Sequence, residues 1–260
     1  MRRTKIITIA NNKGGVGKTT TTINLSAGLR DKGYKVLVVD LDGQGNLTIA
    51  LTGERGVKPT IYEAIVNPNE IAKLQPRYIP SKGKGGGELY LISSSRDLFA
   101  GSMELAEAEG RLDRLAKVLE RFNGEYDFVL IDTTPVIDLI TINALRVADM
   151  VIIPTLPHYL SVIGSIDIIT SLVEIKPTKQ AEIYLLLAQW NSRSTSHKLA
   201  EETIRNWGAK SFTSKIRTNI SLAEAPAVRE DIFQYAPKSN GAKDYKALTE
   251  EVVEWYNRVK

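Results

Sequence analysis

Residues 10–20 read Ala-Asn-Asn-Lys-Gly-Gly-Val-Gly-Lys-Thr-Thr and stand between a short apolar run and a helical pattern. The three glycines of this segment let successive backbone N–H groups converge on phosphate oxygens, and the positive end of the following helix points at the same place. Lys18 would reach the β- and γ-phosphates of a nucleotide, and the Thr19 hydroxyl would bind Mg²⁺. The segment therefore predicts a phosphate-binding loop that joins a strand to a helix.

The loop departs from the common pattern G-x-x-x-x-G-K-[ST] at two positions. Asn12 takes the place of the first glycine, and a second lysine, Lys13, lies inside the loop. In both respects the segment resembles the deviant Walker A motif of the ParA/MinD group of P-loop ATPases. The resemblance implies that the chain binds ATP with Mg²⁺ and hydrolyses the ATP, and that Lys13 reaches across a homodimer to the nucleotide of the other subunit. A solvent-exposed loop lysine is the alternative interpretation of Lys13.

Two further segments place carboxylates after predicted buried strands. The apolar run at 36–39 leads to Asp40 and Asp42, and the run at 128–131 leads to Asp132. Ligands bind at the carboxyl ends of the strands in open α/β sheets, so these side chains are expected beside the phosphate loop. Asp132 has the position of an aspartate that holds Mg²⁺, directly or through water.

The family resemblance gives the first two aspartates different roles. The family motif D-x-D-P-Q-G-N matches residues 40–46, except that Gly43 replaces the proline. By this resemblance Asp42 lies near the attacking water and Asp40 has a supporting role. The alternative for Asp42 is to cap the N-terminus of a helix predicted at 46–51. The predicted catalytic residues are therefore Lys13, Lys18, Asp42 and Asp132, and the predicted metal ligands are Thr19 and Asp132.

The resemblance continues into the last third of the chain, where it implies contacts with the adenine base. A predicted strand at 183–188 leads to Asn191, and a loop that contains Asn219 ends in Leu-Ala-Glu-Ala-Pro. Both asparagines fall on or close to base-contacting positions of the family. The predicted nucleotide contacts are thus Lys13, Gly14, Gly15, Val16, Gly17, Lys18, Thr19, Thr20, Asn191 and Asn219.

Length and composition are consistent with one domain. The chain has 260 residues, of which 43% are hydrophobic and 25% charged, and buried strands alternate with helices along it. This order predicts an α/β fold of the P-loop NTPase type, with a doubly wound, mostly parallel sheet and helices on both faces. We expect a single ATPase domain over 1–260 and no separate N-terminal DNA-binding domain. The absence of cysteine excludes disulfides, zinc–thiolate sites and iron–sulfur clusters.

The resemblance favours a ParA-type partition ATPase, which binds nonspecific double-stranded DNA as an ATP dimer and leaves it when a ParB-like adaptor stimulates hydrolysis. Such a protein is cytoplasmic and associated with the nucleoid. The net charge of +4 permits a polyanionic partner, and the segment 193–217 carries six basic and only two acidic side chains. An ordinary solvated surface is the alternative there. The predicted DNA-binding residues are Arg193, Arg217, Lys198 and Lys215.

Two other functions share the phosphate loop. A MinD-like ATPase cycles on a membrane, but the segment 244–260 has four acidic and three basic side chains, whereas a membrane-surface helix needs a basic polar face. We therefore expect no membrane partner, and no apolar run approaches the length of a membrane span. An ATP-dependent ligase or amidase is a third possibility, against which Lys13 argues.

Overall fold

The computed structural model describes residues 3–56, 58–81, 85–175 and 181–260. Their strands form one eight-stranded sheet with the order β3-β4-β2-β5-β1-β6-β7-β8. All neighbouring strands are parallel except β3, which pairs antiparallel with β4. The predicted mostly parallel sheet is therefore confirmed. The strands are β1 (Lys5–Ile9), β2 (Lys35–Asp40), β3 (Arg77–Tyr78), β4 (Glu88–Ile92), β5 (Phe128–Asp132), β6 (Met150–Thr155), β7 (Glu182–Trp190) and β8 (Ile216–Arg217).

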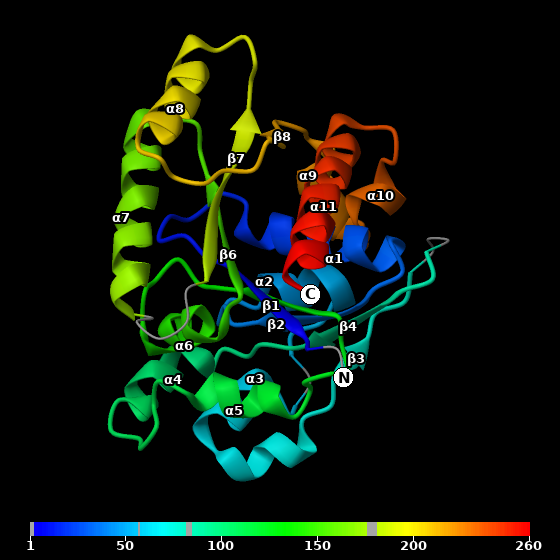
Figure 1. Ribbon diagram of the computed structural model, residues 1–260. Coiled ribbons are helices and arrows are strands. Elements are labelled where there is room, and N and C mark those ends of the chain that lie inside the picture. Colours follow the sequence, from blue (N-terminus) through cyan, green and yellow to red (C-terminus); the bar gives the residue numbers. More distant parts are fainter. Residues whose placement is uncertain (1–2, 57, 82–84, 176–180) are drawn as a thin grey trace.

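Helices cover both faces of this sheet, as a doubly wound fold requires (Figure 1). The helices are α1 (Lys18–Asp31), α2 (Asn46–Thr52), α3 (Ile61–Val66), α4 (Leu98–Leu105), α5 (Arg114–Glu120), α6 (Leu139–Val147), α7 (Tyr159–Ile175), α8 (Thr195–Asn206), α9 (Ser221–Glu224), α10 (Ile232–Tyr235) and α11 (Asn240–Val259), with 3₁₀ turns η1 (Pro68–Lys73) and η2 (Ala225–Val228). The helix predicted at 46–51 corresponds to α2.

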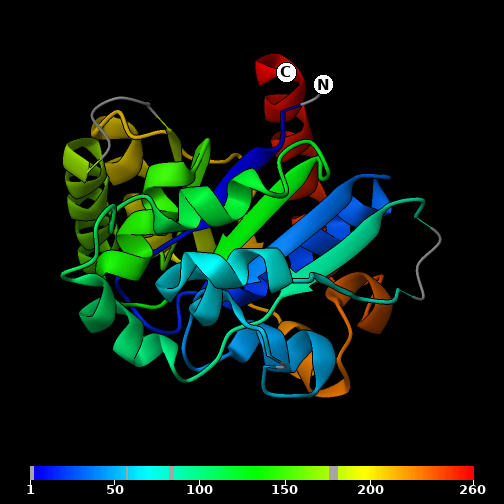
Figure 2. The same ribbon diagram turned by 90° about the horizontal axis from the view of Figure 1, so that it is seen from below.

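Alternate residues of the central strands fill two separate cores, because successive side chains of a strand point to opposite faces. On one face Val36 and Leu130 pack with apolar residues of α1 and α11. On the other face Leu37 and Val129 pack with α3, α4, α5 and α6. Figure 2 shows this second layer from below, with its cyan and green helices toward the viewer. Strands that are buried on both faces read as continuous apolar runs, which is why the sequence revealed them.

Three of the central strands end at one edge of the sheet and deliver the polar residues expected there. Strand β1 leads into the phosphate loop, β2 ends at Asp40 and β5 ends at Asp132. In the register of the sheet, Asp132 lies opposite Ile9 on one side and opposite Asp40 on the other. The parallel pairing therefore brings together segments that are far apart in the sequence.

Candidate nucleotide-binding site

The loop between β1 and α1 has the open backbone that phosphate binding needs. Gly15 and Gly17 have φ angles of 70° and 95°, in the left-handed region that favours glycine. A Cβ atom added at Gly14, Gly15 or Gly17 would meet no protein atom within 4 Å, so the concave side of the loop is open. No described side chain caps the start of α1, whose first N–H groups remain available to an anion.

The Lys18 ammonium lies inside this loop. Its Nζ donates hydrogen bonds to the carbonyl oxygens of Asn11, at 3.0 Å, and Lys13, at 2.9 Å. Burial lowers the pKa of Lys18, although the negative charges of Asp132 and Asp42 oppose this effect. The loop thus holds a positive charge beside its own N–H groups, where a phosphate would bind.

Asp132 and Thr19 form the second part of the site. The Thr19 hydroxyl donates to Oδ2 of Asp132 at 2.7 Å, and the Thr22 hydroxyl lies 3.3 Å from Oδ1. Burial raises the pKa of Asp132 to about 8; the negative charge of Asp40 adds to this rise and the hydrogen bond from Thr19 opposes it. A hydroxyl oxygen beside a buried carboxylate is a donor set that suits a hard divalent cation. These residues therefore fit Mg²⁺, whose charge would favour the ionised carboxylate.

Asp40 and Asp42 differ in what they touch. The Asp40 carboxylate accepts hydrogen bonds from the amide and the hydroxyl of Thr48, at 2.8 and 2.7 Å, and from the Asp42 amide. Burial raises the pKa of Asp40 to about 6, against these hydrogen bonds. The Asp42 carboxylate accepts a hydrogen bond from the Gln44 amide, and Asp42 lines the cavity. Gly45 is the N-cap of α2, so the capping alternative for Asp42 is wrong.

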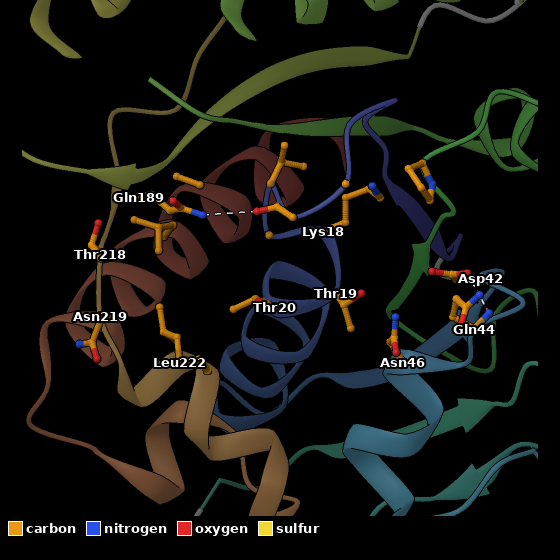
Figure 3. Close-up of a pocket in the computed structure, with 18 of the residues that line it drawn as sticks. Lys18, Thr19, Thr20, Asp42, Gln44, Asn46, Gln189, Thr218, Asn219 and Leu222 are labelled. Carbon is orange, nitrogen blue, oxygen red and sulfur yellow. Dashed lines mark hydrogen bonds between the residues drawn. The ribbon is translucent and has the colours of Figure 1, made fainter. Parts of the chain in front are cut away.

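A cavity of about 980 Å³ is lined by the phosphate loop, Lys18, Thr19 and Asp42, and it extends to both sides of the loop. Lys18, Thr19 and Thr20 lie in its middle (Figure 3). Of the predicted nucleotide contacts, all except Lys13 and Asn191 line it. One end is formed by Asp42, Gln44 and Asn46, and the opposite end by Gln189, Thr218, Asn219 and Leu222.

The second end does not include Asn191, for which a contact with the base is predicted. Asn191 is exposed, accepts a hydrogen bond from the Arg193 amide and does not line the cavity. Gln189 does line the cavity, and its Nε2 donates to the Gly15 carbonyl at 3.3 Å. Gln189 has a φ of 54°, and the pairing of β7 with β8 shifts register at this residue. The resulting irregularity turns the Gln189 side chain toward the phosphate loop, which no local sequence signal indicates.

Comparisons with known proteins agree with this geometry. The model of a family described as "AAA domain" matches residues 4–185. The chain is 33% identical to the chromosome partitioning protein ParA of Myxococcus xanthus, over 96% of this chain and 88% of the relative. It is 34% identical to the chromosome-partitioning ATPase Soj of Thermus thermophilus, over 97% of this chain and 98% of the relative. The chain belongs to the ParA family of P-loop ATPases. The predicted family and ATPase class are thus confirmed.

Solved structures have the same fold as this ParA-family chain. A putative plasmid partition protein of Borrelia burgdorferi bound to AMPPNP superposes with a TM-score of 0.80 at 26% identity, over 96% of this chain and 99% of the other. A cobyrinic acid a,c-diamide synthase of Mycobacterium smegmatis with bound ADP and magnesium gives 0.81 at 24% identity, over 99% and 97%. The similarity to the diamide synthase concerns the fold alone, so it does not support the ligase or amidase alternative.

The extra lysine of this ParA-family loop points away from the cavity of its own chain. Its Nζ lies 3.1 Å from the Leu160 carbonyl and 3.4 Å from the Ser161 hydroxyl, in the first turn of α7. These partners are neutral, and no described carboxylate forms an ion pair with Lys13. The side chain is therefore held by hydrogen bonds to uncharged groups of α7.

The structure divides the four predicted DNA-binding residues of this ParA-family chain into two pairs. Lys215 forms an ion pair with Glu201 at 2.7 Å and lies over the Trp190 ring. Arg217 binds both oxygens of Asp244 and lines the nucleotide cavity. Both charges are neutralised within the chain, so we revise the prediction and leave these two residues out of a DNA surface. Arg193 and Lys198 are exposed, and neither has an acidic partner among the described residues.

Proposed function

We propose that this ParA-family ATPase binds ATP and Mg²⁺ between two copies of itself, and that the resulting dimer binds DNA without sequence preference. Hydrolysis, stimulated by a ParB-like adaptor, returns the chain to a form with low affinity for DNA. The observation that carries this proposal is a complete phosphate loop whose second lysine points out of its own cavity. As a consequence we place the protein on the nucleoid, with both ATP and DNA bound by the same ATPase domain.

The residues of one chain account for nucleotide binding. The loop N–H groups and Lys18 contact the β- and γ-phosphates, and the base occupies the end lined by Gln189 and Asn219. Thr19 and Asp132 would hold Mg²⁺, directly or through water. When bound, the metal neutralises charge on the phosphates, and phosphoryl transfer to water then depends on positioning.

A second copy would complete the site. A lysine is a point-charge phosphate binder, so Lys13 offered from the other subunit adds a positive charge to the γ-phosphate and makes dimerisation depend on ATP. The surface around Lys13 supports this arrangement, because Tyr159 and Leu160 are 57% and 76% exposed. Exposed apolar side chains of this size are typical of protein interfaces.

Replacing Asp42 with alanine should leave ATP binding and dimerisation intact and lower the rate of hydrolysis by about 100-fold or more. The carboxylate lies at the end of the cavity formed by Asp42, Gln44 and Asn46, which we call the phosphate end. It is free there to orient water, so its loss affects the transition state more than the bound ground state. Phosphate release and sedimentation with ATP measure the two effects. Normal turnover by this variant would move the water-positioning role to another residue.

For DNA, we propose a surface at the start of α8 that contains Arg193 and Lys198. Contacts with phosphates release counterions, so the logarithm of affinity should fall with the logarithm of salt by about 0.9 for each contact. Arg193→Ala combined with Lys198→Ala should weaken binding and flatten this slope for every DNA sequence. Lys117→Ala combined with Lys246→Ala removes the same charge from α5 and α11 and should change neither. A double variant of α8 with the wild-type slope would contradict the assignment.

The membrane alternative finds no support in the last helix. The apolar face of α11 packs in the core, where Tyr245, Val252 and Trp255 are buried, so this helix has no free face for a bilayer. Among the described residues, no helix is long and apolar enough to cross a membrane. Pelleting with anionic liposomes and with DNA, each with ATP, distinguishes the two functions. We expect ATP-dependent pelleting with DNA only.

A further inference from the structure

Gly43 follows Asp42 at the phosphate end of the site and packs against the ring of Phe99. Its φ angle lies outside the left-handed region, so the backbone does not require glycine there. The ring of Phe99 instead limits the space beside this residue. A Cβ atom at Gly43 would lie 3.1 Å from Cε1, Cε2 and Cζ of Phe99, which is tighter than almost all real contacts of a Cβ atom. The tip of the Phe99 ring therefore occupies the volume that a side chain at 43 would fill.

The position matters because the family motif that residues 40–46 resemble has proline at the position of Gly43. Proline fixes φ and so restricts the loop that carries the aspartate, whereas glycine leaves the same loop more freedom. In this chain the Ser94 hydroxyl donates a hydrogen bond to the Asp42 carbonyl at 2.6 Å, and packing on Gly43 adds a second restraint on the loop. Phe99 lines the same cavity as Asp42 although its ring is 58% exposed, so its position is not explained by burial in the core.

The helix that carries Phe99 is well anchored. Leu98 and Leu105 of α4 are buried in the second core, and the Ser102 hydroxyl donates to Asp138 at 2.6 Å. Asp138 is in turn the N-cap of α6, just beyond the loop that follows Asp132. A ring on such a helix can hold a neighbouring loop in place.

We propose that Phe99 is a positioning residue for hydrolysis, which holds the Asp42 loop by packing on Gly43 and so replaces the proline of the family motif. This inference rests on the proposed role of Asp42. In this role Phe99 needs no contact with the phosphates or the attacking water, because it acts by limiting the orientations of the Asp42 carboxylate.

The first test is Phe99→Ala in the full-length chain. The rate of hydrolysis at saturating ATP should fall about tenfold, because a small displacement of a positioning group is costly in the transition state. The dissociation constant for ATP and the ATP-dependent sedimentation should stay at wild-type values. The matched control is Met103→Ala, which removes a side chain that is 81% exposed, one turn further along α4, and should leave the rate unchanged.

The second test exchanges the two restraints. Gly43→Pro alone should slow hydrolysis, because its ring would collide with Phe99. In the described structure the Gly43 amide donates no hydrogen bond within the protein, so the proline removes none. Gly43→Pro together with Phe99→Ala should recover hydrolysis to within about threefold of the wild-type rate, since proline then supplies the restraint without a clash.

Two results would overturn the inference. One is a double variant as slow as, or slower than, Phe99→Ala. The other is loss of the ATP dimer in Phe99→Ala, which would make the ring an interface residue. The Asp42→Ala variant separates this failure from failure of the proposed function: if Asp42→Ala is slow but Phe99→Ala is not, only the role of Phe99 is wrong.

Discussion

Replacing Lys18 with alanine is expected to weaken ATP binding by at least about 100-fold. Three carboxylates, Asp40, Asp42 and Asp132, lie around this part of the site, and two of them already oppose the burial-induced drop in the pKa of Lys18. Without the ammonium, a triphosphate would enter a site that is neutral or negative. The loop would also lose the hydrogen bonds that Lys18 donates to its carbonyl groups.

Titration calorimetry with ATP and Mg²⁺ measures this loss, and circular dichroism shows that the variant is folded. Lys32→Ala is a suitable control, because Lys32 is an exposed lysine at the other end of α1 whose partner is Glu250. A dissociation constant of Lys18→Ala within threefold of the wild-type value would contradict the placement of the phosphates in this loop.

Lys13→Ala is expected to differ from Lys18→Ala. This variant should bind ATP about as well as the wild type does, but it should lose the ATP-dependent dimer. Lys13 does not line the cavity of its own chain, so its removal takes away no contact there. If the ammonium binds the nucleotide of the other subunit, its loss removes a charge-assisted contact from each half of the dimer, or about 3 kcal/mol in total. The dimer dissociation constant should then rise by at least about 100-fold.

Sedimentation velocity with ATP and with ADP measures the association, and calorimetry on the same samples measures nucleotide binding. A Lys13→Ala chain that dimerises like the wild type would show that Lys13 is an ordinary loop lysine. A chain that loses both ATP binding and dimerisation would instead place Lys13 in its own site.

The phosphate end of the site could be predicted because its signals are local. A strand, a glycine loop and a helix are consecutive in the sequence, and continuous apolar runs mark the parallel strands that carry Asp40 and Asp132 to the same edge. Register alone then brings these residues together, although they are far apart along the chain. Asp42 and Thr19 reach the cavity for the same reason.

The base end and the charged surface could not be predicted in the same way. Gln189 lines the cavity and Asn191 does not, because of an irregularity at the end of β7 that depends on pairing with β8. Lys215 and Arg217 count as free charges in the sequence, yet Glu201 of α8 and Asp244 of α11 neutralise them. Pairing between distant side chains is a property of the tertiary structure, and a local excess of lysine and arginine therefore overstates the free positive surface.

Phe99 illustrates the same limit. In the sequence it is one apolar residue of a helical segment, and Gly43 is only a departure from a motif. The packing of the ring on the glycine joins these two observations, because it shows that the space of the missing side chain is filled. Phe99 fills the space beside Gly43, although the two residues are more than fifty positions apart in the sequence. Only the structure reveals this contact.

Whether ATP switches this chain onto DNA is tested most directly with the Asp42→Ala variant, because slow hydrolysis keeps its nucleotide state fixed during the measurement. Its affinity for a random-sequence duplex is measured by fluorescence anisotropy at one salt concentration, with ATP and with ADP. A dimer presents the α8 surface twice, so binding should be at least about tenfold tighter with ATP. Equal affinity with the two nucleotides would contradict the switch.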